Sequence, residues 1–201
     1  MASIGIMGGT FDPIHYGHLI LAEQAWEQLK LDKVIFVTAA DPPHKIGQDV
    51  TDVVHRQKMT CLAIENNAHF EHSDIEINRD GPSYTVDTLR EIIKICGEDT
   101  KLYLLLGADE AESFMFWRDP YGIAELAVIA VANRPGCAPV EPLITMPEDM
   151  ANRIVALDMP GVDISSTDIR DRVNSDRSIR YLLPDSVEKY ILGNGLYRGL
   201  R

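Results

Sequence analysis

Short apolar runs alternate with longer amphipathic segments along most of the chain. The runs are four or five residues long, which favours buried strands, and they cover 3–7, 33–37, 102–106, 127–131 and 154–157. Phe70 and Ile75-Glu76-Ile77 are also strand-like. Between the runs, apolar residues recur at helical spacing and predict helices over 17–31, 56–66 and 85–95. Two shorter helices are expected after Ser166 and after Pro184.

This alternation predicts an α/β fold that is Rossmann-like and doubly wound, with a mainly parallel sheet and helices on both faces. Right-handed crossovers bring the carboxyl ends of parallel strands to one edge of the sheet. The loops at that edge follow Met7, Val37, Leu106 and Val131. We expect a single domain over residues 1–201, with a C-terminal helical portion, about 165–201, packed on it.

The composition argues against a disordered, a membrane-spanning or a disulfide-rich protein. With 45% apolar and 25% charged residues in 201, the chain is not mainly disordered. No apolar run approaches the roughly 18 residues of a membrane span, and no signal peptide is evident, so no membrane association is expected. The cysteines Cys61, Cys96 and Cys137 are far apart and odd in number. That pattern disfavours a disulfide framework or a zinc knuckle and favours a cytoplasmic location.

The charge is negative and unevenly distributed. The net charge is −12, and residues 1–152 carry 24 acidic but only 11 basic side chains. Such an acidic body argues against a nucleic-acid partner, because binding to nucleic acid needs a positive surface that displaces counterions. All six histidines fall within the first 72 residues, which directs attention to the beginning of the chain.

The segment after the first predicted strand carries the clearest candidate chemistry, Gly8-Gly9-Thr10-Phe11-Asp12-Pro13-Ile14-His15-Tyr16-Gly17-His18. Small residues let a ligand approach the backbone, and a helix start offers unpaired N–H groups, so the pattern favours phosphate. The imidazoles of His15 and His18 can donate to phosphate oxygens as negative charge builds up. The segment is neither a Walker loop nor a GxGxxG fingerprint.

Other interpretations of this segment stay open. A glycine pair after a strand is often only a turn, and His15 and His18 could be surface side chains at a helix start. A catalytic zinc site would need a third protein ligand, which the spacing does not supply. The sequence therefore favours phosphate binding over a metal site, and we assign no metal ligand.

A second segment, Ile164-Ser165-Ser166-Thr167-Asp168-Ile169-Arg170, opens a predicted helix. Ser and Thr residues are good N-caps, and Arg170 falls one turn inside the helix. Alone, the segment is explained by plain capping with a solvated arginine. Together with the glycine loop, it becomes a second helix start directed at phosphates, with a guanidinium to clamp them.

Weaker signals lie at the same predicted edge. Pro42-Pro43-His44-Lys45 offers two cations in a stiffened loop, and Gly107-Ala108-Asp109 offers a carboxylate for ribose hydroxyls at a strand end. Gly81–Thr85 leads into a helix, Trp117 is in a loop-like setting, and Arg134 follows a strand end. Each also has a structural explanation, as a turn, a helix cap, a core aromatic or a solvated cation.

Taken together, GGTFDPIHYGH and ISSTDIR resemble the motifs of the HxGH-motif nucleotidyltransferases. PPHK, GPSYTVDTL, GAD followed by FxxW, and YLLPDSVEKYILGNGLY narrow the resemblance to the bacterial nicotinate mononucleotide adenylyltransferases. The match runs from about residue 4 to 197. The resemblance implies transfer of AMP from ATP to nicotinate mononucleotide, giving deamido-NAD and pyrophosphate in NAD biosynthesis. It also implies Mg²⁺, held largely through the ATP phosphates.

The resemblance further implies site residues. The catalytic residues are expected to be His15, His18 and Arg170. The ATP-binding residues are expected to be Gly8, Gly9, Thr10, Phe11, Gly107, Asp109, Ile164, Ser165 and Ser166. The residues that bind nicotinate mononucleotide are expected to be His44, Lys45, Tyr84, Thr85, Trp117 and Arg134. Many relatives have an asparagine where this chain has Ala39, so no side-chain contact is expected from that position.

Two other functions stay open. One is another adenylyltransferase of the superfamily, such as one acting on phosphopantetheine, although those chains are shorter and should lack the Trp117 pocket and the GPSYT segment. The other is a non-catalytic nucleotide sensor, against which the presence of His15, His18 and Arg170 argues. The sequence leaves open whether the protein forms a homo-oligomer.

Overall fold

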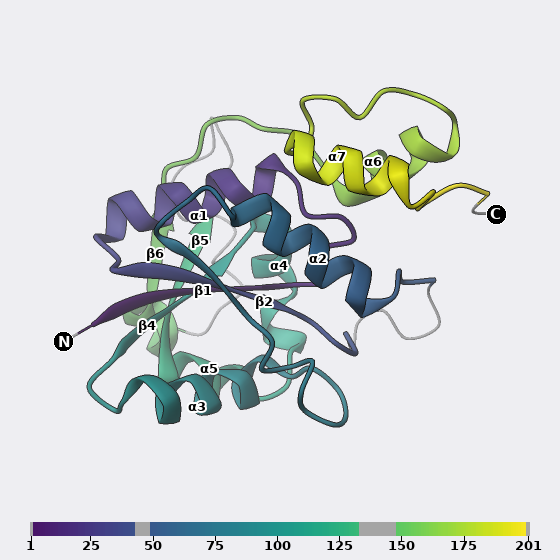
Figure 1. Ribbon diagram of the computed structural model, residues 1–201. Helices are drawn as coiled ribbons and strands as arrows, with labels where there is room; N and C mark the ends of the chain where they lie inside the picture. The colour runs from purple at the N-terminus through teal and green to yellow at the C-terminus, as the bar shows by residue number, and fades with distance from the viewer. Residues whose placement is uncertain (1, 43–48, 133–147, 200–201) are drawn as a thin grey trace.

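The computed structural model describes residues 2–42, 49–132 and 148–199. Within these ranges, six parallel strands form one sheet in the order β3-β2-β1-β4-β5-β6 (Figure 1). They are β1 (Ser3–Gly9), β2 (Lys33–Thr38), β3 (Phe70–Ser73), β4 (Lys101–Leu106), β5 (Ala127–Ala132) and β6 (Ile154–Leu157). The strand order reverses between β1 and β4, as in doubly wound folds, so the predicted fold class is confirmed.

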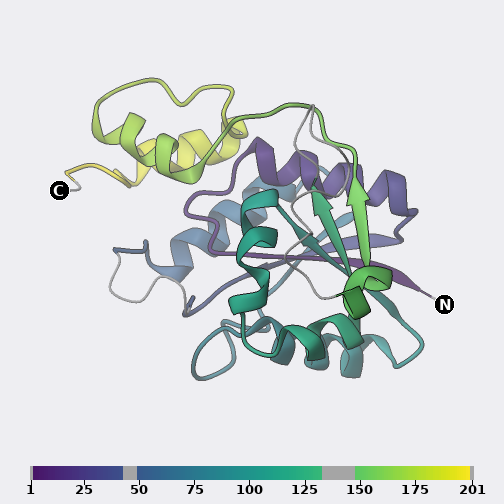
Figure 2. The same ribbon diagram turned by 180° about the vertical axis from the view of Figure 1, so that it is seen from behind.

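Helices cover both faces of this sheet (Figures 1 and 2). One face carries α1 (Tyr16–Leu29) and α2 (Val53–Ile64), and the other carries α3 (Thr85–Cys96) and α5 (Pro120–Leu126). The remaining helices are α4 (Ala108–Ser113), α6 (Ser166–Asn174), α7 (Asp185–Gly193) and the 3-10 turns η2 (Phe114–Phe116) and η4 (Glu148–Arg153).

The inner strands β1, β2, β4 and β5 are mainly apolar because both of their faces are covered, whereas the edge strand β3 reads Phe-Glu-His-Ser. In β2, Val34 and Phe36 belong to the buried cluster under α1 and α2. Their neighbours Ile35 and Val37 belong to the cluster under α3 and α5. Successive side chains of a strand point to opposite faces, so a parallel sheet buried on both sides needs an unbroken apolar run.

The C-terminal helices share a core with the N-terminal half of the chain. Ile169 of α6 and Val187 of α7 belong to the same buried cluster as Leu21 and Met59, from α1 and α2. Figures 1 and 2 show α6 and α7 together beyond the ends of α1 and α2. The main-chain N–H of Tyr16 also donates to the Leu182 carbonyl at 3.0 Å. The start of α1 is therefore attached to the C-terminal part of the chain.

One strand prediction was wrong. Residues 75–77 alternate apolar and polar side chains, but they form a turn after β3 instead of a strand. The N–H of Asn78 donates to the Asp74 carbonyl at 3.0 Å, and the buried Glu76 carboxylate accepts from the Thr88 hydroxyl at 2.6 Å. The alternation thus reflects anchoring of a turn to α3 and not pairing in a sheet.

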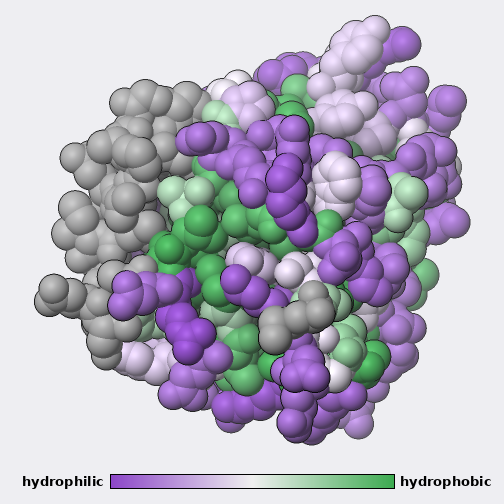
Figure 3. All heavy atoms as spheres, turned by 90° about the vertical axis from the view of Figure 1, so that its left-hand side faces the viewer, coloured by the Kyte–Doolittle hydropathy of each residue, from purple (hydrophilic) through white to green (hydrophobic). Residues whose placement is uncertain are grey.

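The face of the molecule shown in Figure 3 is mainly hydrophilic. In the view of Figure 3, hydrophilic side chains cover most of the face and surround a smaller apolar area. Among the described residues, every helix is too short or too polar to span a bilayer.

A buried hydrogen bond ties the end of the chain to the loop between β1 and α1. The Tyr197 hydroxyl donates to Asp12 Oδ1 at 2.7 Å, and both side chains are buried. Burial and the neighbouring Asp12 raise the pKa of Tyr197, so the phenol stays protonated and remains a donor. The main-chain N–H of Thr51 donates to the other carboxylate oxygen at 3.1 Å.

Removing this hydroxyl should destabilise the fold. In Tyr197→Phe, a buried carboxylate oxygen loses its donor, which should lower the free energy of unfolding by about 1–3 kcal/mol. Urea unfolding measures the change. Tyr181→Phe is the matched control, because Tyr181 is 75% exposed and should lose no more than about 0.5 kcal/mol. Equal losses in the two variants would contradict the importance of the buried bond.

Candidate active site

A cavity of about 1000 Å³ opens at the carboxyl edge of the sheet, between the ends of β1 and β4. Most of its lining comes from three places: the end of β1 with the β1–α1 loop (residues 10–15) and the start of α1, the end of β4 with the start of α4, and the segment that enters α6. Open α/β sheets bind ligands where the strand order reverses, which is the position of this cavity.

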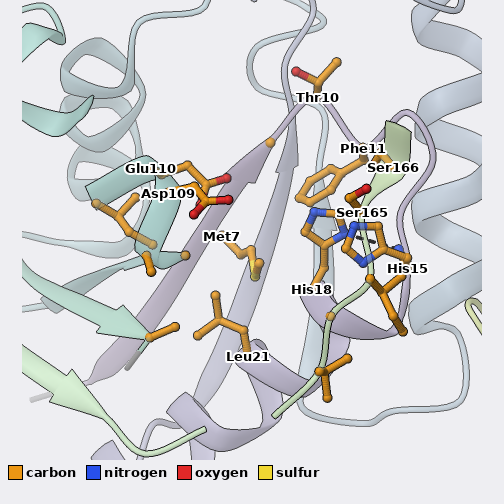
Figure 4. Close-up of a pocket in the computed structure, with 18 of the residues that line it drawn as sticks. Met7, Thr10, Phe11, His15, His18, Leu21, Asp109, Glu110, Ser165 and Ser166 are labelled. Atoms are coloured by element: carbon orange, nitrogen blue, oxygen red, sulfur yellow. Dashed lines mark hydrogen bonds between the residues drawn. The ribbon is translucent and has the colours of Figure 1, made fainter. Parts of the chain in front are cut away.

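His15 and His18 lie side by side at the start of α1 (Figure 4). Their rings stack, with centroids 3.8 Å apart, and the edge of the Phe11 ring packs against His18. The His15 main-chain N–H donates to His18 Nδ1 at 3.2 Å. Because Nδ1 accepts this bond, the proton of the neutral His18 ring lies on Nε2, which is then a donor for a ligand.

Burial keeps both imidazoles neutral in the free protein. It lowers the pKa of His15 to about 4. Burial also holds the pKa of His18 well below its ordinary value, and the neighbouring His15 adds to this effect. His15 Nδ1 is buried and has no hydrogen-bond partner in the part of the chain that the structure describes. A buried polar atom without a partner is unusual, and here it lies at a cavity.

Two glycines leave space that a side chain would fill, Gly17 beside His15 and Gly8 in the cavity. A Cβ on Gly17 would lie 3.0 Å from Cε1 and Nδ1 of His15, so a side chain there would displace the imidazole. A Cβ on Gly8 would meet no described heavy atom within 4 Å, and Gly8 lines the cavity. A side chain at Gly8 would therefore fill space that is open to a ligand.

The start of α6 is bonded directly to the β1–α1 loop. Arg170 Nη1 donates to the Asp12 carbonyl at 2.7 Å, and the Ser166 hydroxyl donates to the Pro13 carbonyl at 2.8 Å. Ser165 caps α6 by accepting from the Asp168 N–H at 3.1 Å. The guanidinium of Arg170 and the histidine pair consequently line the same cavity. The structure brings the two predicted phosphate-directed segments together.

The predicted ATP-binding residues all line this cavity. They are Gly8, Gly9, Thr10, Phe11, Gly107, Asp109, Ile164, Ser165 and Ser166. In Figure 4, Asp109 lies across the cavity from the histidine pair. Gly107 is the N-cap of α4, so Asp109 stands in the first turn of that helix. The structure gives these residues a common location, and their roles toward ATP stay predictions.

The predicted mononucleotide-binding residues are less completely placed. Trp117 lines the cavity, whereas Tyr84 and Thr85, at the start of α3, are not among its described lining residues. The Arg118 guanidinium lies 4.4 Å from the centre of the Tyr84 ring, so Tyr84 is beside the turn that carries Trp117. The remaining three predicted residues, His44, Lys45 and Arg134, lie outside the described residues.

The sequence did not predict two buried residues that bond to loops near the cavity, Arg56 and Ser83. Arg56, on α2, is only 2% exposed and donates to main-chain carbonyls of two loops, the β1–α1 loop and the connection between β2 and α2. The Ser83 hydroxyl accepts from the main-chain N–H groups of Ala40 and Asp41, at 3.0 and 3.3 Å. A signal for Arg56 existed, since it shares the buried face of its helix with Met59, and a charged residue is unusual there.

The loop after β2 is held through its backbone. The Ala39 N–H donates to the Gly9 carbonyl at 2.9 Å, and the Ala39 carbonyl accepts from Arg56 Nη1 at 2.6 Å. These contacts do not depend on the side chain of residue 39. The backbone at this position can therefore be fixed in a chain that has alanine there.

Comparison with known proteins gives a consistent assignment. A family model described as cytidylyltransferase-like matches residues 6–172. A Thermoanaerobacter relative named "Probable nicotinate-nucleotide adenylyltransferase" is 48% identical over 198 residues, which cover 97% of this chain and 94% of the relative. A Desulfitobacterium hafniense relative of the same name is 46% identical over 198 residues, which cover 97% of this chain and 95% of the relative.

Solved structures agree on the fold. The nicotinic acid mononucleotide adenylyltransferase of Plasmodium falciparum, solved in complex with NaAD, has a TM-score of 0.78 to this chain at 18% identity, with 98% of each chain covered. The same protein in complex with APC has a TM-score of 0.76. The assignment beyond the fold comes from the sequence relatives, and with the family model they show that this chain belongs to the cytidylyltransferase-like family and, within it, to the nicotinate-nucleotide adenylyltransferases.

Proposed function

We propose that this protein transfers AMP from ATP to nicotinate mononucleotide, forming deamido-NAD and releasing pyrophosphate, as a step of NAD biosynthesis. The observation that carries the proposal is the shared cavity, in which the His15–His18 pair and Arg170 meet at the carboxyl edge of the sheet. The names of relatives that match nearly the whole chain support the choice of substrates.

The direct test is to incubate the protein with ATP, Mg²⁺ and a panel of phosphorylated acceptors that includes phosphopantetheine. Product mass and pyrophosphate release are then measured. Deamido-NAD as the main product supports the proposal. A product formed from phosphopantetheine would indicate another adenylyltransferase, and nucleotide binding without pyrophosphate release would indicate a sensor.

The reaction that suits this cavity is a direct in-line displacement. An oxygen of the mononucleotide phosphate attacks the α-phosphorus of ATP, and the bond from that phosphorus to pyrophosphate breaks. The attacking phosphate is already ionised at neutral pH, so no general base is needed. Such transfers depend on positioning and charge stabilisation more than on covalent chemistry by the protein.

The histidine pair and Arg170 would stabilise the transition state. His18 Nε2–H is the donor that the hydrogen bond at Nδ1 leaves for a phosphate oxygen. Arg170 supplies a fixed positive charge near the leaving pyrophosphate, together with Ser165 and Ser166 at the start of α6. Local donors of this kind let a protein with a net charge of −12 bind two anionic substrates.

The mononucleotide would bind on the α3 side of the cavity. Trp117 would stack on the nicotinate ring, with Tyr84 and Thr85 beside it. Main-chain N–H groups at the start of α3 would meet the carboxylate. On the sequence resemblance, His44, Lys45 and Arg134 would hold the mononucleotide phosphate.

Mg²⁺ fits this site as a companion of ATP. Among the described residues, no group of three or more His, Cys, Asp or Glu side chains could hold a metal ion. Mg²⁺ prefers oxygen ligands and keeps several waters, so ATP phosphates and water would supply most of its coordination. When bound, it would neutralise part of the phosphate charge.

Replacing His18 should slow turnover without unfolding the protein. His18→Ala removes the Nε2–H donor, which should lower kcat by about 10²-fold or more, as for the loss of an oxyanion donor. Steady-state kinetics measure the change. His69→Ala is the control, because His69 stacks on Trp26 and is not among the described residues lining the cavity. Unchanged turnover in His18→Ala would refute the role of His18.

The protein should prefer the acid over the amide mononucleotide. Main-chain donors at a helix start favour an anion, so the carboxylate substrate should have a kcat/KM at least about tenfold higher than that of nicotinamide mononucleotide. Initial rates with each substrate at fixed ATP provide the comparison. Equal values would remove the proposed selectivity.

The depressed pKa of His15 predicts how stability depends on pH. Between pH 6.5 and about 4, the unfolded chain binds a proton at His15 that the folded chain does not bind. This contribution is therefore complete above pH 6.5 and is lost as the pH falls, by at most about 3 kcal/mol. Urea unfolding at pH 7.5 and 4.5 should show a smaller loss for His15→Asn than for the wild type. Identical losses would contradict the prediction.

A further inference from the structure

Arg56 is a buried cation outside the histidine–arginine site. Its guanidinium is buried beneath the edge of the sheet where the cavity opens, and it makes four hydrogen bonds to main-chain oxygens. Nε donates to Thr51 at 2.7 Å, and Nη2 donates to Ala40 at 3.2 Å. Nη1 donates both to Thr10, at 2.8 Å, and to Ala39, at 2.6 Å. All four acceptors lie in loops.

The two bonds of Nη1 join the loops that carry the two proposed substrate sites. Thr10 belongs to the β1–α1 loop, on the ATP side, and lines the cavity. Ala39 begins the loop after β2, which continues in the sequence to His44 and Lys45, the proposed ligands of the mononucleotide phosphate. One nitrogen atom thus bonds to the backbones of both loops, which the Ala39 N–H also joins directly through its bond to the Gly9 carbonyl.

The positive charge of Arg56 is buried between the β1–α1 loop and the β2–α2 connection. No ion pair of Arg56 is present among the described residues, and its bonds go to uncharged carbonyls. The Asp12 carboxylate, already bonded to Tyr197 and Thr51, contributes a negative charge to the electrostatic surroundings of the guanidinium. Lysine could keep the charge, but it has no planar fork that reaches four carbonyls in two loops at once.

We propose that Arg56 is a positioning residue for adenylyl transfer, which holds the β1–α1 loop and the described ends of the β2–α2 connection (39–42 and 49–52) in the relative positions that in-line attack requires. This inference rests on the proposed function. Effective molarity falls steeply when the reacting groups are misplaced, and a shift of about 1 Å can cost about 10²-fold in rate. Since Arg56 contacts the loops and not the described cavity itself, its loss should affect turnover more than the binding of one substrate.

The test compares Arg56→Lys and Arg56→Met with the wild type. For Arg56→Lys, we expect kcat to fall about 10²-fold while the Kd for ATP alone changes by less than about threefold. In Arg56→Met, which also removes the charge, kcat should fall at least as far. Circular dichroism and thermal unfolding establish that each variant is folded at the assay temperature. If Arg56→Met does not fold, Arg56→Lys alone carries the test.

A matched control separates positioning from general stability. Ile92→Ala removes a side chain that is 3% exposed on the opposite face of the sheet, and it should lose stability without losing kcat per folded molecule. If Arg56→Lys keeps wild-type kcat, or loses no more than Ile92→Ala, the positioning role is overturned. Failure of the wild type to form deamido-NAD would overturn the proposed function itself, which distinguishes the two failures.

Discussion

The carbonyl groups of the β1–α1 loop are the attachment points on which the candidate site depends. Arg56 from α2 bonds to the Thr10 carbonyl, whereas Arg170 and Ser166 from α6 bond to the carbonyls of Asp12 and Pro13. Two helices from distant parts of the chain therefore fix one short loop. The histidines at the start of α1 and the guanidinium of Arg170 keep their relative positions because they are attached to the same loop.

Stability and site geometry are linked through the same polar cluster. The Asp12 carboxylate is buried, and it accepts from Tyr197 near the end of the chain and from Thr51 before α2. A buried carboxylate is costly unless its oxygens have donors, so these bonds favour one arrangement of the loop over alternatives. The C-terminal segment thus supports the loop that lines the cavity.

The donors and the positive charge at the candidate site come from a few nearby groups and not from the net charge of the protein. The chain as a whole is acidic, and carboxylates such as Asp109 and Glu110 also line the cavity. The proposed binding of anions therefore depends on a few donors at helix starts and on the guanidinium of Arg170. The histidines remain uncharged in the free protein because they are buried. A bound triphosphate would favour their protonated forms, since a nearby negative charge stabilises a cation. The free site therefore avoids the repulsion between two adjacent imidazolium ions.

The sequence by itself determined the fold class, because an unbroken apolar run and a helical repeat are properties of consecutive residues. It also indicated the segments containing His15, His18 and Arg170, whose spacing is local. It could not identify Arg56 or Asp12 as organising residues, since their partners are 46 and 185 residues away, and it mistook the turn at 75–77 for a strand. Only the tertiary structure decided those roles, because they arise from hydrogen bonds between loops that folding brings together.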